Sequence, residues 1–185
     1  SNQISTAGYE ASGTSNMKFM MNGALTIGTL DGATIEMAAA AGEENFFLFG
    51  LTAEQVAGSR SWYSPQWHYD NEPETRAALD LIFGDHFSGN ERGVFPPLRE
   101  TLMTHGDHYM HLADLSPYLE ADRRVLELYS DQDAWSRRAI LNVARWTGSS
   151  MNLQPWTFII VRQKADRERL AELAPYARHV AGAAL

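Results

Sequence analysis

A lysine stands behind a stretch of small polar residues near the start of the chain. The segment "EASGTSNMK" (10–18) ends in Lys18, just before an apolar run, and holds Thr14 and Ser15. Small residues let backbone N–H groups converge, and a helix that begins there adds its dipole, so the pattern suits a phosphate. A lysine one turn further could hold that phosphate or bind an aldehyde cofactor such as pyridoxal phosphate. Judged from its spacing alone, this segment more commonly indicates a turn followed by a surface lysine.

Other groups of side chains give weaker signals. Three histidines spaced three residues apart could bind zinc, but such steps drift around a helix and a glycine interrupts them, so we expect no metal site. Two adjacent glutamates resemble surface charge more than a glycosidase pair, because neighbours in sequence do not flank a bond from opposite sides. Four aromatic residues could stack sugars, although packing of an irregular loop is more common. These groups are His105, His108 and His111; Glu43 and Glu44; and Trp62, Tyr63, Trp67 and Tyr69.

Composition restricts the class of protein. The chain has 185 residues, 44% of them hydrophobic, a net charge of −8 and no cysteine. This is enough apolar material for a core, and it leaves no disulfide framework or thiolate site. The acidic balance argues against a nucleic-acid or acidic-membrane partner. Without a visible signal or membrane-spanning segment, we expect a soluble, cytoplasmic protein. Both ends lack the usual start and stop signals, so we expect a piece of a longer protein or of more than one.

The order of predicted elements favours an α/β fold with a parallel sheet, followed by a helix-rich portion. Residues 1–15 are expected to be loop and residues 59–70 irregular. The expected strands are 24–29, 45–50 and 157–163. The expected helices are 16–25, 31–42 with Asp31 as N-cap and Gly42 as its end, one beginning at Thr52, and then 73–83, 97–105, 115–129, 133–146 and 166–185.

A long stretch of the chain resembles a known family. The segment "NQISTAGYEASGTSNMKFMMNGALTIGTLDGATIEM" (2–37), followed by "GEENFFLFG" (42–50), is similar to a signature of the glycogen, starch and maltodextrin phosphorylases. The similarity continues through "FGDHFS", "DHYMHLADLSPYLEADRRV" and "YSDQDAWSRRAILNVAR", to about Arg145. It implies the C-terminal part of the family's second, Rossmann-like domain. The parent reaction is phosphorolysis of an α-1,4-glucan to glucose 1-phosphate, with α-glucan and phosphate as partners.

The resemblance also implies roles for individual residues. Lys18 corresponds to the catalytic lysine that carries pyridoxal phosphate, whose own phosphate works beside the substrate phosphate as a proton donor or electrostatic partner. Thr14 and Ser15 correspond to positions near the cofactor phosphate, and the family usually has glycine where this chain has Ser15. The positions that hold hydroxyls of the glucosyl unit are Glu10, Ser12 and Gly13. The family's upstream phosphate-binding segment and N-terminal domain are not in this sequence, so we expect the isolated chain to be inactive.

The last part of the chain resembles a different family. The segment "WTGSSMNLQPWTFIIVRQKADRERLAELAPYARHVAGAAL" (146–185) is similar to the early part of flavin-dependent nitroreductases. This implies an incomplete α+β segment with Asn152 at the edge of an FMN ring and Ser150 and Gln154 in the same loop. We therefore expect two parts, 1–143 and 144–185. The alternatives to a phosphorylase are an FMN-dependent oxidoreductase fragment and a catalytically inactive hybrid. The parent families are usually homodimers.

Overall fold

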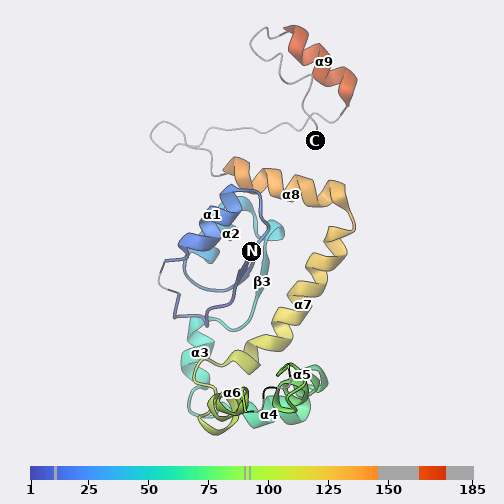
Figure 1. Ribbon diagram of the computed structural model, residues 1–185. Helices are drawn as coiled ribbons and strands as arrows, with labels where there is room; N and C mark the ends of the chain where they lie inside the picture. The colour runs from blue at the N-terminus through green and yellow to red at the C-terminus, as the bar shows by residue number, and fades with distance from the viewer. Residues whose placement is uncertain (11, 90, 92, 146–162, 174–185) are drawn as a thin grey trace. The chain divides into compact units, whose positions relative to one another are not determined.

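The computed structural model describes residues 1–10, 12–89, 91, 93–145 and 163–173 (Figure 1). The chain forms two compact units, Ser1–Arg145 and Trp146–Leu185. Three predicted FMN contacts, Ser150, Asn152 and Gln154, lie outside the described residues, as does nearly all of the predicted strand 157–163.

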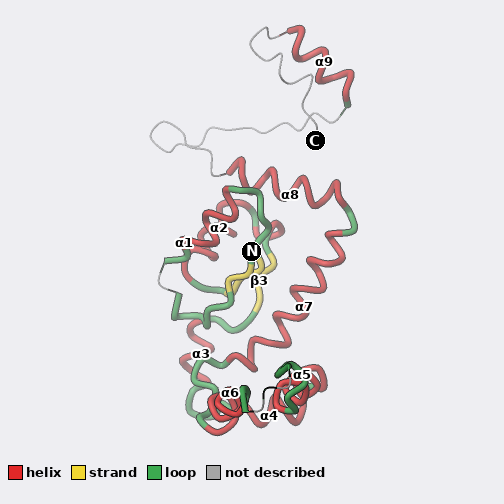
Figure 2. The backbone as a smooth tube through the Cα atoms, in the orientation of Figure 1, coloured by secondary structure: helices red, strands yellow, loops and turns green. Residues whose placement is uncertain are grey.

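A small parallel sheet lies in the first unit (Figure 2). Its strands are β1 (Asn2–Gln3), β2 (Ile27–Thr29) and β3 (Phe47–Phe49), in that order. Asn2 pairs with Ile27, and Ile27 pairs with Phe47. The predicted α/β class with a parallel sheet is confirmed. The segment 1–15 was expected to be loop, and this was wrong for β1, because a two-residue strand is visible only through its pairing with β2.

The helices that follow β1 and β2 pack into one apolar cluster. They are α1 (Thr14–Met21) and α2 (Gly32–Ala41), and a short 3-10 turn, Glu43–Asn45, precedes β3. Their buried side chains include Met20 and Met37, which pack with Phe46. Asp31 is the N-cap residue of α2 as predicted, but its side chain makes no capping hydrogen bond. Gly42, with φ of +93°, ends the helix in a conformation that favours glycine.

Two long helices cover the sheet on a second apolar cluster. They are α7 (His111–Tyr129) and α8 (Gln132–Arg145), and α7 contacts both β2 and β3. Ile27, Phe47 and Phe49 from the sheet pack with Ala121 of α7. The helix expected at 115–129 begins four residues earlier than predicted. Its first turn follows Met110, whose φ is +53°. The chain changes direction there through its backbone conformation, and no residue type typical of an N-cap marks the position in the sequence.

Short helices form the remaining part of the first unit (Figure 1). They are α3 (Ala53–Ser59), α4 (Pro65–Asn71), α5 (Pro73–Phe83), α6 (Pro96–Arg99) and a π-helical turn, Glu100–Thr104. Thr52 is the N-cap residue of α3, as predicted, and the structure adds a reciprocal capping box with Gln55. The irregular structure expected over 59–70 was wrong for 65–70, which lie in α4, because Pro65 occupies the first turn of that helix, where its fixed φ suits a helix. The single helix expected at 97–105 divides into α6 and the π-helical turn.

The second unit contributes one described helix, α9 (Lys164–Leu173). Lys164 and Glu168 form an ion pair at 3.8 Å on its surface. Most of its described side chains are exposed, including Leu170. In the described part of the chain, no helix is both long and apolar enough to cross a membrane.

Candidate functional site

The carboxylate of Glu10 is held by four donors. Oε2 accepts hydrogen bonds from Gln3 Nε2 at 2.7 Å and Ser5 Oγ at 2.9 Å. Oε1 accepts from the backbone N–H of Gly13 at 2.6 Å and of Ser12 at 3.3 Å. Donors stabilise the ionised form, so these bonds, that of Gln3 above all, lower the pKa of Glu10. The residue is therefore a fixed anion at neutral pH.

Residues of the sheet and of the start of α2 hold Glu10 in position. Gln3 Oε1 accepts hydrogen bonds from Thr29 N at 3.2 Å and Thr29 Oγ1 at 2.7 Å, so Gln3 connects Glu10 to β2. The backbone N–H of Glu10 donates to Asp31 Oδ2 at 2.8 Å. A Cβ at Gly32 would lie 2.9 Å from Glu10 Cγ, so the chain passes Glu10 with no room for a side chain there. Residues from β1, β2 and the start of α2 thus fix the position of Glu10.

Gly13 sets the start of α1 beside this carboxylate. Its φ is +61°, and a Cβ there would lie 2.8 Å from Ala33 Cβ and 2.9 Å from Asn16 Oδ1. Asn16 is buried, and its Nδ2 donates to Thr34 Oγ1 at 2.9 Å. Only glycine fits both the backbone conformation and the space. The loop therefore delivers its N–H groups at a fixed place at the start of α1.

The first turn of α1 faces a cavity with open backbone donors. No side chain caps this helix, and within the described residues no partner binds the N–H groups of Thr14 and Ser15. The cavity, of about 370 Å³, is lined by Ser1, Asn2, Gln3, Glu10, Ser12, Gly13, Thr14, Ser15, Asn16 and Phe19. Ser15 lies inside the helix, where its Cβ is accommodated without positive φ. The arrangement can bind an anion or a polar ligand beside a carboxylate.

Lys18 lies one helical turn beyond Thr14. It is exposed, and its carbonyl accepts a hydrogen bond from Asn22 Nδ2 at 2.7 Å. It does not line the cavity described above. The structure thus brings together five predicted residues, Glu10 and Ser12 to Ser15, and places the lysine on the adjoining turn. Sequence reasoning missed Gln3 and Asp31, because each is brought to Glu10 by the fold rather than by a local pattern.

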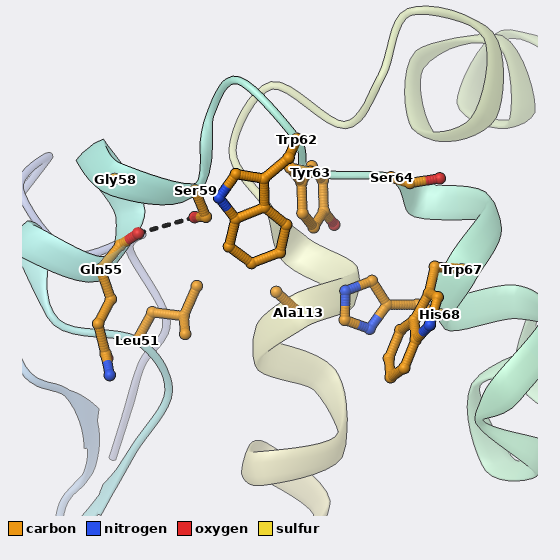
Figure 3. A pocket seen from close by; sticks show the side chains of 10 residues that line it. All are labelled: Leu51, Gln55, Gly58, Ser59, Trp62, Tyr63, Ser64, Trp67, His68 and Ala113. Carbon is orange, nitrogen blue, oxygen red and sulfur yellow. Dashed lines mark hydrogen bonds between the residues drawn. The ribbon is translucent and has the colours of Figure 1, made fainter.

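A second cavity, of about 740 Å³, lies among the aromatic residues (Figure 3). Trp62, Tyr63, Trp67 and His68 line it with part of α3 and with Ala113 of α7. The aromatic composition of this segment was its only signal in the sequence. The histidines considered for zinc do not gather into a site: the described residues contain no group of three or more His, Asp or Glu side chains that could hold a metal ion.

Comparison with known proteins identifies the family to which the chain belongs. A family model described as carbohydrate phosphorylase matches residues 1–152. The chain belongs to the carbohydrate phosphorylase family. A second model, described as the nitroreductase family, matches only residues 136–177.

Individual relatives are similar over the same region. The chain is 49% identical over 144 residues to a glycogen phosphorylase of Chlamydia pneumoniae, covering 78% of this chain and 18% of that protein. It is 51% identical over 146 residues to one of Synechocystis sp., covering 78% and 17%. It is 48% identical over 145 residues to the muscle form of Bos taurus, again covering 78% and 17%. The chain thus spans less than a fifth of the length of these relatives.

Proposed function

We propose that this chain is the cofactor-carrying part of an α-glucan phosphorylase, from the C-terminal part of its second, Rossmann-like domain. The whole protein would convert an α-1,4-glucan and phosphate into glucose 1-phosphate. The observation that carries the proposal is the Glu10 carboxylate fixed against the open start of α1, with Lys18 one turn away. The similarity to glycogen phosphorylases over 78% of the chain supports it.

The residues present fit pyridoxal phosphate. Open N–H groups at Thr14 and Ser15 would bind its phosphate, and a Cβ at Gly13 would clash with Ala33 and Asn16. Lys18 would supply the amine that binds the aldehyde group. When bound, the cofactor supplies a phosphate group that can donate a proton or stabilise charge beside the substrate phosphate.

Glu10, Ser12 and Gly13 would hold the sugar. An ionised carboxylate accepts hydrogen bonds and offers about four lone-pair positions. Three are taken by donors at 2.6–2.9 Å, whereas the N–H of Ser12 is more distant, at 3.3 Å. A glucosyl hydroxyl would take the position of this longest bond. Glu10 would therefore orient a hydroxyl of the sugar while its carboxylate remains ionised.

Covalent labelling tests the proposal at Lys18. The chain contains only two lysines, Lys18 and Lys164, so the second is an internal control. After incubation with pyridoxal phosphate and borohydride, peptide mass mapping should find the label on Lys18 at cofactor concentrations at least about tenfold lower than on Lys164. That ratio corresponds to about 1.4 kcal/mol of binding at the phosphate site.

Two variants sharpen this experiment. Lys164→Ala should leave the labelling of Lys18 unchanged, and Lys18→Ala should leave only the slow reaction of Lys164 and the amino terminus. Equal labelling of both lysines in the unmodified chain would refute a specific cofactor site. Because the readout is mass, it does not require an active enzyme.

A second candidate function concerns residues 144–185, which we propose as the start of a nitroreductase-like segment joined to the phosphorylase-like part. The family-model match at 136–177 supports it. FMN mixed with the chain should then elute with the protein on a desalting column, with its fluorescence quenched, and Asn152→Ala should release it. Free passage of FMN would exclude flavin binding by this chain. If neither cofactor binds stoichiometrically, the chain is an inactive hybrid.

A further inference from the structure

The aromatic cavity shares no lining residue with the cavity at Glu10. It lies between α3, the turn that follows it, the start of α4 and Ala113 of α7 (Figure 3). Its volume of about 740 Å³ falls in the range of roughly 300–1,000 Å³ that small-molecule sites occupy. It is therefore large enough to hold a ligand in its own right.

Two tryptophans leave their indole rings open to water at this cavity. Trp62 is 74% exposed and Trp67 is 56% exposed, and both line the cavity. Trp67 stands edge-on to the His68 ring, with centroids 5.1 Å apart. Within the described residues neither indole N–H has a hydrogen-bond partner. Large flat apolar faces with unused donors are typical of surfaces that bind a ligand with both apolar and polar sides.

The inner wall of the cavity is rigid. Tyr63 O–H donates to Asp107 Oδ2 at 2.7 Å, and the same oxygen accepts the N–H of Leu112 at 2.9 Å. Asp107 is buried, so this contact is shielded from water. Burial and the neighbouring carboxylate raise the pKa of Tyr63, so its ring remains neutral. Tyr63, which stands between Trp62 and Trp67 in the sequence, therefore presents a fixed and uncharged ring to the cavity.

The polar side chains around the cavity are partly unused. Gln55 Oε1 accepts the N–H of Thr52 at 2.9 Å, which leaves its amide NH₂ without a partner in the described structure. His68 Nδ1 lies 2.9 Å from Glu72 Oε1, so Nε2 remains for a ligand. The described lining includes no Lys, Arg, Asp or Glu. A phosphate or nucleotide would find no lysine or arginine in this lining, whereas a molecule with apolar faces and hydroxyl edges matches both its aromatic rings and its hydrogen-bonding groups.

We propose that this cavity is a second carbohydrate site, which binds a segment of an α-glucan chain. Sugar rings stack on Trp62 and Trp67, and their hydroxyls bond to Gln55 and His68. The choice of an α-linked glucan rests on the proposed function, whereas the recognition of sugar rings rests on the cavity itself. Such a site holds a polymeric substrate to the protein without taking part in the reaction.

Titration of the full chain with maltoheptaose tests this site. Binding should be saturable, and the indole N–H resonances of Trp62 and Trp67 should shift in an NMR titration of the unmodified protein. Trp62→Ala and Trp67→Ala should each weaken binding about tenfold or more in calorimetry. Phe87→Ala removes a ring that is 61% exposed and does not line this cavity, so it should change the affinity less than twofold.

Several results would overturn the proposal. These are the absence of saturable binding at millimolar maltoheptaose, unshifted indole resonances, or unchanged affinity in the double tryptophan variant. Loss of binding in Glu10→Gln, with the tryptophan variants unaffected, would place the sugar in the other cavity. Equal binding of cellohexaose would refute the α-linkage. Labelling of Lys18 is independent of these readouts, so its failure would refute the proposed function while leaving tryptophan-dependent sugar binding intact.

Discussion

At the scale of single residues, Gln3 connects the candidate site to the sheet. Its amide nitrogen donates to Glu10 and its amide oxygen accepts two bonds from Thr29, while the side chain is 8% exposed. Glu10, Ser12 and Gly13 were predicted from the resemblance, but Gln3 was not. It lies seven residues from Glu10, and only the pairing of β1 with β2 brings it to Thr29.

Replacing Gln3 by alanine should lower the free energy of unfolding by about 1–3 kcal/mol at pH 7, because Thr29 and Glu10 both lose a buried partner. Denaturant unfolding measures this change. Gln66→Ala is the matched control: its Nε2 bonds to Asp70 on an exposed surface, so the loss should stay within about 0.5 kcal/mol.

The difference in stability between the unmodified chain and Gln3→Ala should depend on pH. The folded pKa of Glu10 is lowered, so its bonds stabilise the protein above the unfolded pKa of about 4.3. This contribution is lost as the pH falls through the lower folded pKa. Without Gln3, the folded pKa moves back up. The stability difference between the unmodified chain and Gln3→Ala should therefore shrink from pH 7 towards about pH 3.5. A difference that is constant over this range would show that Glu10 is not coupled to Gln3.

At the scale of elements, local signals predicted the fold well where they exist. The bounds of α2 follow from Asp31 and Gly42, and the starts of α3 and α5 follow from Thr52 and Pro73. The strand at Phe47–Phe49 follows from its apolar run. In each case the information lies within a few residues of the element, so the pattern can be recognised without the fold.

The elements that were missed depend on distant contacts. α4 packs against α5 and α7, and its segment of aromatic and polar residues has no helical periodicity of its own. The π-helical turn at Glu100–Thr104 continues α6 with wider hydrogen bonding, which no residue type announces. The aromatic cavity has the same origin, because its walls come from α3, α4 and α7. Its residues were noticed in the sequence, but their gathering was not predictable.

At the scale of the whole molecule, the described parts of the two units differ in how many side chains they bury. The described residues of Ser1–Arg145 form four apolar clusters of buried side chains. The described helix of the second unit, α9, has ten residues with mostly exposed side chains. A helix of this length gains little stability from its backbone alone. Resistance to unfolding should therefore be concentrated in the first unit.

Limited digestion with proteinase K should cut first within residues 146–185, because cleavage requires local unfolding and the described side chains of α9 are mostly exposed. Mass spectrometry at short times should find a product that retains residues 1 to about 145. Prior addition of pyridoxal phosphate serves as a control, since it should leave this early cleavage unchanged. First cuts between Gly23 and Gly50 would contradict the expected order.

The contacts of Gln3 also affect how the chain avoids misfolding. Successive side chains of a strand point to opposite faces, so a one-residue slip of β1 along β2 would turn Gln3 away from Thr29 and Glu10. The slipped arrangement would bury polar groups without partners, at a cost of about 1–3 kcal/mol for each. The Gln3 side chain, which orders the candidate site, thus also favours the native strand register over the register slipped by one residue. A chain that assembles the sheet in the slipped register would therefore also lose the site.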